Sequence, residues 1–384
     1  MTVPLARRNL LANTPRLIRS AAGIAFAVLL MTVEIGLRDA FLESMVITPR
    51  ALDGDIMLVN PTKYQFDRPA QVSWRQLYQA RAVPGVATAR PVYMERMAPI
   101  WKNPQDQHLF RITAYGFDPE QPVFLFPDVS AKLEALRQPD TVMMDRRARS
   151  FLGEASAGTE TELARRHVKV VGTFRLGPNF FADGNVIMSD RNFFKLFGAR
   201  AEMKDTDRPD IEIGVIKVLP GFDIPEVKHA LRAALPSNVA VLTKAELIEE
   251  EIEFNLKTSP IGPIFALGTI VGFAVGIMIS YQILFSELSD QRSQYATLKA
   301  MGYQNRYLMK VVLQQAIFYA VVGYIPAWLF GLLVFWVVGE LVLLPLRMSF
   351  ELTATTFALT VTMCVVSALI AVRRVIASDP AELF

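Results

Sequence analysis

The sequence contains few residues of the kinds that usually carry chemistry. One cysteine and three histidines occur among 384 residues. The single thiol, Cys364, excludes a disulfide-stapled domain and a thiolate metal cluster. His108, His167 and His229 lie far apart, and none has a second Cys or His at ligand spacing. No G-x-S-x-G or H-E-x-x-H motif occurs, so we predict a non-enzymatic chain without catalytic residues, metal ligands or a bound cofactor.

Charged residues are also scarce, and their absence is concentrated in long stretches. They make up 20% of the chain, below the roughly 25% of soluble domains. None occurs in 258–286, 311–339 or 352–372, and 20–37 contains only Glu34. A membrane-spanning helix needs about 18–20 such residues. The sequence therefore predicts an α-helical membrane protein with four transmembrane helices. It excludes a soluble enzyme or disordered scaffold, and a net charge of +3 is too small to favour nucleic acid.

Basic residues flank the predicted spans unequally. Ten lie before span one, between spans two and three, and after span four, whereas the loop 340–351 has only Arg347. By the positive-inside rule, both termini and the second loop face the cytoplasm. The alternative, a first span that is a cleaved signal peptide, is disfavoured because no convincing small-x-small cleavage site follows it.

The expected layout follows from these stretches and their flanks. It comprises a cytoplasmic segment 1–19, span one at 20–37, an outward domain 38–257 that ends in a stalk helix 243–257, span two at 258–285, a cytoplasmic loop 286–310, span three at 311–339, a short outward loop 340–351, span four at 352–372 and a cytoplasmic tail 373–384.

Glu34 is the only acid inside a predicted span. Intramembrane acids are functional suspects by default, often in proton relays. The alternative, which we favour, is an ion pair with Arg38 one helical turn later. No Asp, Glu, Lys, Arg or His occurs in spans two to four to complete a relay.

The outward domain alternates strand-like and helix-like segments, which predicts an α+β fold with room for two lobes. The expected strands are 55–59, 109–115, 167–175, 185–188 and 211–219, and the expected helices are 73–81, 129–137, 190–197 and 224–235. The charge clusters 145–147 and 205–210 indicate solvated faces. The aromatic run 115–126 contains Phe117, Phe124 and Phe126; it favours core packing over a groove for a lipid-like ligand.

The segment 243–257 leads almost directly into span two. Thr243 and Glu246 fit the spacing of a capping box, and apolar residues recur at helical spacing. It is either a surface helix that happens to precede a span or a stalk that carries motion between membrane and outward domain. The sequence alone does not distinguish the surface helix from the stalk.

Small residues follow a stripe along two of the spans. They are Gly268, Gly272, Gly276 and Ser280 in span two, and Gly323, Ala327 and Gly331 in span three. Small-xxx-small spacing lets helix backbones approach closely in lipid. We favour packing among the four spans slightly over a homodimer seam. Neither span carries a polar stripe, which disfavours a channel or an ion-coupled carrier.

The loop 286–310 reads as an amphipathic helix that ends at Gly302, with Tyr295, Leu298 and Met301 on its apolar edge. Such a helix lies on lipid headgroups or docks into a cytoplasmic partner. The loop has few basic residues, so attraction to lipid headgroups alone does not explain this helix well.

At 294–303 the sequence QYATLKAMGY resembles the coupling segment of FtsX/MacB-type ABC transporter permeases, and its residues are most similar to those of the DevC branch. The start LARRNL at 5–10 and the tail DPAELF at 379–384 fit the same branch. The layout of one span, a large outward domain and three further spans also matches. Gln294 stands where the family commonly has Glu.

The resemblance implies a concrete role in the bacterial inner membrane. Such permeases are homodimers with a MacB-like periplasmic domain, and each binds a separate ABC ATPase subunit that holds ATP and Mg. The implied ATPase-coupling residues are Arg292, Gln294, Tyr295, Leu298, Lys299, Met301 and Gly302. The absence of any Gly-Lys dipeptide, and so of a P-loop, agrees with a separate ATPase. A DevC-like member would work with a periplasmic adaptor and an outer-membrane channel to export a lipid-like or amphipathic substrate.

Two alternatives remain beside this hypothesis. One is an FtsX-like mechanical regulator of a periplasmic cell-wall hydrolase, which transports nothing. The other is a membrane receptor or sensor, which the lack of a cytoplasmic output domain disfavours.

Overall fold

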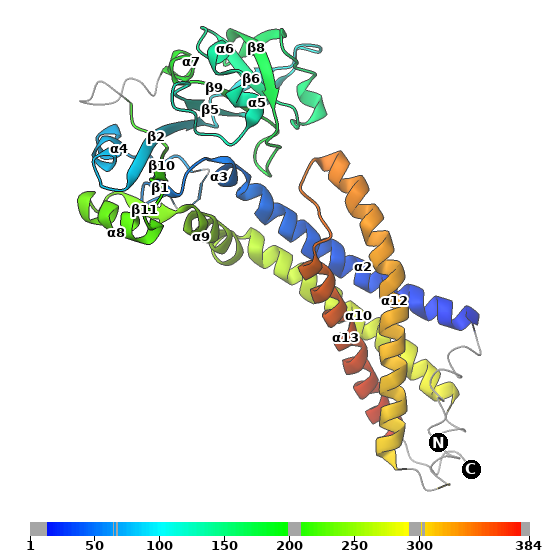
Figure 1. The fold of residues 1–384 in the computed structure, drawn as a ribbon. Helices are drawn as coiled ribbons and strands as arrows, with labels where there is room; N and C mark the ends of the chain where they lie inside the picture. The colour runs from blue at the N-terminus through cyan, green and yellow to red at the C-terminus, as the bar shows by residue number, and fades with distance from the viewer. Residues whose placement is uncertain are drawn as a thin grey trace. The chain divides into compact units, whose positions relative to one another are not determined.

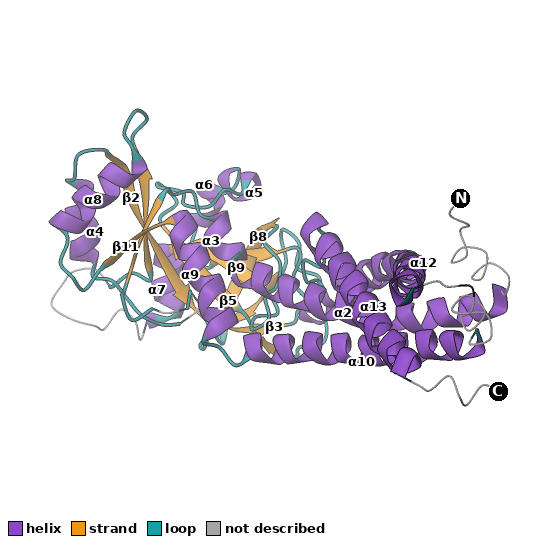
Figure 2. Ribbon diagram, turned by 90° about the horizontal axis from the view of Figure 1, so that it is seen from below, coloured by secondary structure: helices purple, strands orange, loops and turns teal. Residues whose placement is uncertain are grey.

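A computed structural model describes residues 14–63, 65, 66, 68–198, 209–291, 301 and 304–377. The chain divides into two compact units (Figure 1). A helical unit comprises residues 1–40, 260–339 and 346–384, and an α+β unit comprises 41–259 and 340–345. Figure 2 separates the helices from the strands by colour.

Among the described residues, four helices are long and apolar enough to cross a membrane, as the sequence predicts. They are α2 (Thr14–Met45), α10 (Ile261–Asp290), α12 (Asn305–Val342) and α13 (Phe350–Ala377). Each continues beyond the uncharged stretch, and Pro326 lies inside α12 without ending it. By length and composition of these helices, the chain is a multi-pass membrane protein.

The small residues of α10 lie at contacts within the chain. Gly272, Gly276 and Ser280 are buried. A Cβ at Gly272 would come within 3.2 Å of Met31 Cγ in α2. One at Gly276 would come within 2.5 Å of Met363 Sδ in α13. These contacts are intramolecular, and they place the glycine stripe at the junction of three helices.

The stripe of α12 lies against the same bundle. A Cβ at Gly323 would come within 2.6 Å of Ile24 in α2, and Ala327 is buried. Gly331 lies near Met348, whose flexible end a Cβ would reach at 3.2 Å. Tyr324 of α12 donates a hydrogen bond of 2.8 Å to the carbonyl of Thr353. Close backbone approach and side-chain hydrogen bonds together hold helices in lipid.

The α+β unit is built on one eleven-stranded sheet, in the order β11-β1-β10-β2-β5-β9-β6-β8-β7-β3-β4. The strands are β1 (Ile56–Val59), β2 (Val86–Glu95), β3 (Ile100–Lys102), β4 (Leu109–Arg111), β5 (Thr113–Phe117), β6 (Thr141–Asp145), β7 (Glu160–Leu163), β8 (Arg166–Phe174), β9 (Asn185–Ser189), β10 (Ile213–Val218) and β11 (Ala240–Thr243). The expected strands 55–59, 167–175, 185–188 and 211–219 are each one strand, whereas 109–115 is two, β4 and β5, which are not neighbours in the sheet. β2, β3, β6, β7 and β11 were not expected, because most lack an alternating apolar pattern with turn residues on both sides.

Short helices cover this sheet. They are α3 (Ile47–Ala51), α4 (Trp74–Arg81), α5 (Pro127–Ser130), α6 (Leu133–Leu136), α7 (Asp190–Leu196), α8 (Ile224–Ala234) and α9 (Lys244–Lys257), with one 3-10 turn at Ser150–Leu152. The expected helix 129–137 is two short helices instead. Ser189 caps α7 by accepting from the Asn192 amide at 3.3 Å.

Both faces of the sheet are buried, which gives the unit two apolar cores. In β1, Ile56 and Leu58 face one core while Met57 and Val59 face the other. A strand covered on both sides is continuously apolar rather than alternating. Phe117 and Phe124 belong to the second core, so the aromatic run of the sequence is packed interior and not a groove.

The first charge cluster is solvated only in part. Arg146 and Arg147 are exposed, as expected, but Asp145 is only 2% exposed. Its carboxylate accepts hydrogen bonds from the Leu176 and Gly177 amides, at 3.1 and 2.7 Å, and from Asn185 Nδ2 at 2.9 Å. Burial raises the pKa of Asp145 against these bonds. Most of the second cluster, 205–210, lies outside the described residues, because the structure describes only 209 and 210 of it.

Candidate functional site

The first turn of α9 is fixed by a capping box. Thr243 accepts from the amide of Glu246 at 3.2 Å, and Glu246 accepts from the amide of Thr243 at 2.8 Å. Lys228 of α8 forms an ion pair with Glu246. This pairing and the capping bonds lower the pKa of the Glu246 carboxyl. The capping box predicted from the sequence is therefore confirmed.

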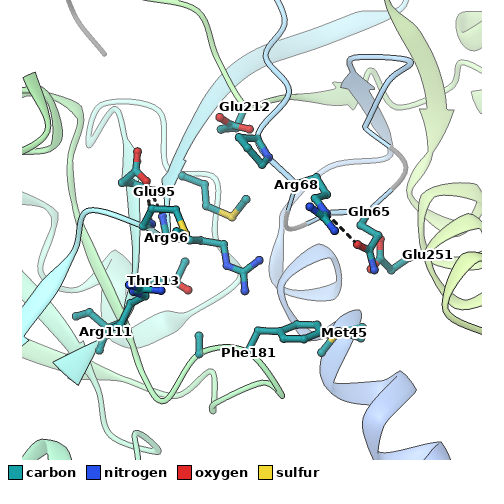
Figure 3. Close-up of a pocket in the computed structure, with 15 residues that line it drawn as sticks. Met45, Gln65, Arg68, Glu95, Arg96, Arg111, Thr113, Phe181, Glu212 and Glu251 are labelled. Atoms are coloured by element: carbon teal, nitrogen blue, oxygen red, sulfur yellow. Dashed lines mark hydrogen bonds between the residues drawn. The ribbon is translucent and has the colours of Figure 1, made fainter. Parts of the chain in front are cut away.

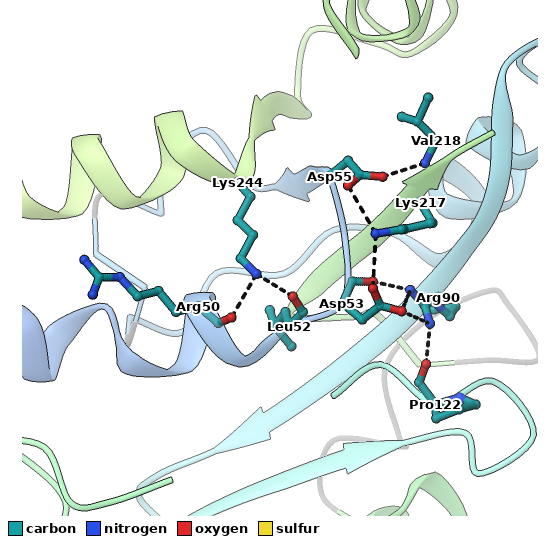
Figure 4. A network of polar contacts seen from close by, with 9 residues as sticks. All are labelled: Arg50, Leu52, Asp53, Asp55, Arg90, Pro122, Lys217, Val218 and Lys244. Carbon is teal, nitrogen blue, oxygen red and sulfur yellow. Dashed lines mark hydrogen bonds and ion pairs between the residues drawn. The ribbon is translucent and has the colours of Figure 1, made fainter. Parts of the chain in front are cut away.

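Lys244, the first residue of α9, binds the segment that follows α2 (Figure 4). Its Nζ donates to the carbonyls of Arg50 at 2.8 Å and Leu52 at 2.7 Å. Its backbone amide donates to Asp55 O at 3.0 Å. Carbonyls at the C-terminus of a helix lack partners within the helix, and a lysine ammonium is a favourable donor to them. The chain entering this unit and the helix leaving it are thus joined at one side chain.

An ionic network continues from this point into the sheet (Figure 4). Lys217 of β10 pairs with Asp53 at 3.2 Å and with Asp55 at 3.3 Å, and Arg90 of β2 pairs with Asp53 at 3.3 Å. Burial opposes the charge of Asp53, but Lys217 and Arg90 outweigh it and hold the pKa of that carboxyl below its usual value. Burial likewise opposes the charge of Lys217, yet the two carboxylates raise its pKa.

A second set of contacts holds the middle of α9. The Glu251 carboxylate is buried and accepts from the Phe66 amide at 2.6 Å. One turn later, Asn255 donates to Glu251 Oε1 at 3.1 Å and accepts from Gln65 at 3.3 Å. A buried carboxylate needs such donors, because an unpaired one would be costly. The stalk helix is therefore clamped to the segment that contains Gln65 and Phe66.

That segment is in turn fixed to the sheet by a buried ion pair. Lys63 and Glu212 lie 3.0 Å apart, with side-chain exposures of 1% and 0%. Glu212 immediately precedes β10. Lys63 also donates to the carbonyl of Arg68. A movement of α9 would therefore reach β10 through Phe66 and Lys63, as well as through Lys244.

Three clamps form the candidate functional site of the α+β unit: Lys244 on the carbonyls of Arg50 and Leu52, Glu251 on the Phe66 amide, and the Lys63–Glu212 ion pair. Each is a mechanical connection between structural elements. They consist of hydrogen bonds and ion pairs between structural elements. Among the described residues, no group of three or more His, Cys, Asp or Glu side chains is placed to hold a metal ion.

The residues predicted to couple to an ATPase fall mostly beyond what the structure describes. Arg292, Gln294, Tyr295, Leu298, Lys299 and Gly302 lie outside the described residues. Met301 is described as a turn residue and is 62% exposed. Their role stays a prediction.

Glu34 does not have the partner expected from the sequence. Arg38 pairs with its neighbour Asp39 at 2.8 Å. The Glu34 carboxylate instead lies against Gly268 of α10, because the glycine leaves the space that a side chain would fill. Another acid of this unit, unlike the half-buried Glu34, is buried. Glu287 was placed in the cytoplasmic loop, but α10 extends to Asp290 and Glu287 is 5% exposed.

The sequence predicts the capping box at Thr243 and Glu246, but it does not predict the three clamps. Lys63 and Glu212 are 149 positions apart, and Glu251 stands in a run of acids that look equivalent in the sequence. The signal that distinguishes Glu251 is its helical phase, since it shares a face with Leu247 and Asn255, the other buried residues of α9.

Three solved structures are similar in part to this chain. The extracellular domain of the noncanonical ABC-type transporter YknZ from Gram-positive bacteria is 11% identical, with a TM-score of 0.34 over 49% of this chain and 98% of that one. The periplasmic region of MacB from Actinobacillus actinomycetemcomitans is 11% identical, with a TM-score of 0.36 over 53% and 94%. A domain of a putative permease protein from Porphyromonas gingivalis is 14% identical, with a TM-score of 0.33 over 50% and 88%.

No curated protein matches the chain. The match that bears on function covers α13 and nearly all of α10, together with the whole of α12. Residues 264–380, which contain three of the four long apolar helices found in the described part of the chain, are similar to the family described as FtsX-like permease C-terminal.

Proposed function

We propose that this chain is the membrane subunit of an ABC transporter of the FtsX/MacB type. The match of residues 264–380 to the FtsX-like permease family carries this proposal. The chain would hydrolyse nothing itself. A separate ABC ATPase would bind ATP and Mg and seat on the loop 286–310, through Leu298, Met301 and their neighbours.

The clamps of the α+β unit support a mechanical mode of action. Lys244 and Glu251 attach α9 at two points along its length. Lys244 Nζ lies 2.7 Å from Leu52 O, and Glu251 Oε2 lies 2.6 Å from the amide nitrogen of Phe66. A helix held at both its start and its middle passes displacement to the sheet instead of bending away from it. In this proposal the stalk transmits ATP-driven motion from span two, which follows α9 after 258–260, to the outward domain.

The remaining features of the proposal concern place and partners. The chain would lie in the bacterial inner membrane as a homodimer, with both termini cytoplasmic and the α+β unit periplasmic. The DevC-like sequence at 294–303 favours export of a lipid-like or amphipathic substrate, together with a periplasmic adaptor and an outer-membrane channel. Ten basic residues against one beside the spans favour this orientation.

Site-specific photo-crosslinking in the native host tests the central claim. A photoreactive amino acid replaces Leu298 in one strain and Arg347, in the other flanking loop, in a control strain. We expect position 298 to capture a protein that mass spectrometry identifies as an ABC ATPase by its P-loop peptide. Position 347 should capture none. An ATPase absent at 298, or present equally at both positions, would overturn the proposal.

A further inference from the structure

The loop 177–183, between β8 and β9, presents two adjacent phenylalanines on the surface of the α+β unit. Phe180 is 46% exposed and Phe181 is 51% exposed. Single apolar residues on a surface need no explanation, but exposed apolar side chains that lie together mark contacts with proteins or lipid. The position of this loop in the fold distinguishes between these two partners.

The loop is held in one shape by its own polar groups. The Asn179 side chain accepts from the amides of Phe181 at 2.8 Å and Ala182 at 2.7 Å, and the Asn179 amide donates to the carbonyl of Ala182 at 3.2 Å. At the start of the loop, the Gly177 amide donates to the buried Asp145 carboxylate at 2.7 Å. Amides that are already bonded suit contact with lipid, because hydrocarbon offers them no replacement partner.

Both phenylalanines lie beside the end of α2. The ring of Phe180 packs edge-to-face on the ring of Phe41, with 5.0 Å between their centres and 82° between their planes. Phe41 is a residue of α2 and is 1% exposed. Phe181 and Met45, the last residue of α2, line the same cavity (Figure 3).

The helix α2 gives the depth of these rings relative to the hydrocarbon. Its apolar stretch ends at Leu37, and the next two residues, Arg38 and Asp39, form an ion pair at 2.8 Å. The helix continues past them, so Phe41 lies about 6 Å beyond Leu37 at 1.5 Å per residue. The headgroup layer adds roughly 5–8 Å to each side of the hydrocarbon core. Phe180, which contacts Phe41, therefore lies at the level of the headgroups.

The charge of the loop is compatible with this position. Asp183 is the only charged residue among 177–183, and it forms an ion pair with Arg149 at 3.0 Å. A charge that leaves water without a partner is costly, and the pairing of Asp183 removes that cost. Phenylalanine is one of the residues that interfacial segments insert at the boundary between headgroups and acyl chains.

We propose that the loop 177–183 is a membrane anchor of the α+β unit. Phe180 and Phe181 insert into the lipid surface on the side of the bilayer that carries this unit, and Phe41 supports them from behind. β8 and β9 both pair with β6, so the anchored loop holds the middle of the sheet at the membrane surface. The inference follows from the course of α2 through the membrane and does not depend on the permease proposal.

The test uses the full chain in phosphatidylcholine nanodiscs that contain a photoreactive phosphatidylcholine. One probe carries its diazirine near the headgroup end of the acyl chain, and a second carries it at the methyl end. Trypsin releases both phenylalanines in the peptide 176–191, and mass spectrometry measures its labelling. We expect the shallow probe to label this peptide strongly and the deep probe to label it weakly. Both probes should label the apolar helices.

The peptide 76–81 is the matched control within the same unit. It contains Tyr78 of α4, an aromatic residue that is 67% exposed. In Figures 1 and 2, α4 lies at one end of the α+β unit, apart from α3, which follows α2 directly. Neither probe should label 76–81, although its aromatic ring is more exposed than that of Phe180.

Variants separate insertion into lipid from packing within the protein. Phe180→Ser with Phe181→Ser should reduce shallow labelling of 176–191 by about fivefold or more, because the two rings supply the affinity for the interface. Phe180→Trp with Phe181→Trp should preserve the labelling, since tryptophan favours the interface. Tyr78→Ser should leave it unchanged. Hydrogen exchange in peptides of β6 reports whether the sheet stays folded in each variant.

Three results would overturn the inference. The first is labelling of 176–191 no stronger than that of 76–81, as expected if a second copy or a partner protein covers the rings. The second is undiminished labelling in the folded serine variant, and the third is equal labelling of 176–191 by both probes. None of these measurements requires an ATPase or transport, so their failure would leave the permease proposal standing, and failure of the crosslink at Leu298 would leave this one standing.

Discussion

The carboxylate of Glu34 in α2 lies directly against Gly268 in α10. A Cβ atom at Gly268 would overlap Oε1 of Glu34, so glycine is what leaves room for the acid. Further along α10, Gly272 and Gly276 bring the same helix against Met31 of α2 and Met363 of α13. The first glycine of the stripe therefore accommodates a polar group, and the next two accommodate apolar ones.

Gly268→Leu should destabilise the helical unit. The new side chain and the Glu34 carboxylate cannot share the space, and overpacking of this kind costs about 1–3 kcal/mol. The measurement is the thermal unfolding midpoint of the full chain in detergent. Ala274→Leu enlarges an exposed residue of the same helix and should not change the midpoint.

A second variant tests the pair specifically. Glu34→Ala in the Gly268→Leu background should restore most of the lost stability, because it removes the group that leucine displaces. If Gly268→Leu and Ala274→Leu unfold alike, or if Glu34→Ala restores nothing, then Glu34 and Gly268 do not share this space.

Lys63→Met should destabilise the α+β unit strongly. It leaves the Glu212 carboxylate buried without its cation, and breaking a buried pair in this way costs about 3–5 kcal/mol. Urea unfolding followed by tryptophan fluorescence reports the change, since Trp74 and Trp101 lie in this unit.

Two controls separate the pair from the loss of a lysine. Replacing both partners, by Lys63→Met with Glu212→Leu, should recover much of the loss, because no charge is then buried. Lys257→Met removes an exposed lysine paired with Glu253 and should have no measurable effect. A single Lys63 variant as stable as the parent would contradict the structural role of the pair.

The sequence predicts the helical unit better than the sheet, for physical reasons. An uncharged stretch such as 311–339 can only be a span, because the hydrocarbon core leaves few alternatives. The capping box at Thr243 was predictable too, since all its partners lie within three residues. β6 was missed because both its faces are buried, so it shows no alternation. The clamps depend on pairs such as Lys63 with Glu212, whose proximity only the folded sheet creates.

The wrong expectation for Glu34 has a similar origin. Helical spacing makes an ion pair with Arg38 reasonable, but it says nothing about the neighbouring helix. Asp39 competes for Arg38, and Gly268 offers Glu34 a place between α2 and α10. Local spacing predicts a partner only where no tertiary contact offers another.

Glu251→Gln should loosen the attachment to α9 of the segment that contains Gln65 and Phe66. A neutral amide is a weaker acceptor than a carboxylate for the Phe66 amide, and bonds to charged groups contribute about 1.5–3 kcal/mol. Hydrogen exchange should therefore accelerate in peptides that contain Phe66. Glu249→Gln changes an exposed acid of the same helix and should leave exchange at Phe66 unaffected. Equal exchange in both variants would rule out the clamp.

Stability of the α+β unit should depend on pH through Asp53 and Lys217. The pKa of Asp53 is lowered by its cations, so its contribution is complete above the usual aspartate value of about 3.9. That contribution is lost as the pH falls through the lower folded value. The pKa of Lys217 is raised, so its contribution is complete below about 10.4 and is lost as the pH rises through the higher folded value.

Asp53→Asn isolates the acidic side of this dependence. The urea midpoint of the variant should lie below that of the parent at pH 7, because the neutral amide no longer attracts Lys217 and Arg90. As the pH falls through the lowered pKa of Asp53, the two midpoints should converge, because protonation removes the same charge from the parent. Asp223→Asn changes the N-cap residue of α8, whose side chain makes no capping bond, and should show no such convergence. If the difference for Asp53→Asn persists unchanged at low pH, the carboxylate charge is not what holds β2 and β10 at this junction.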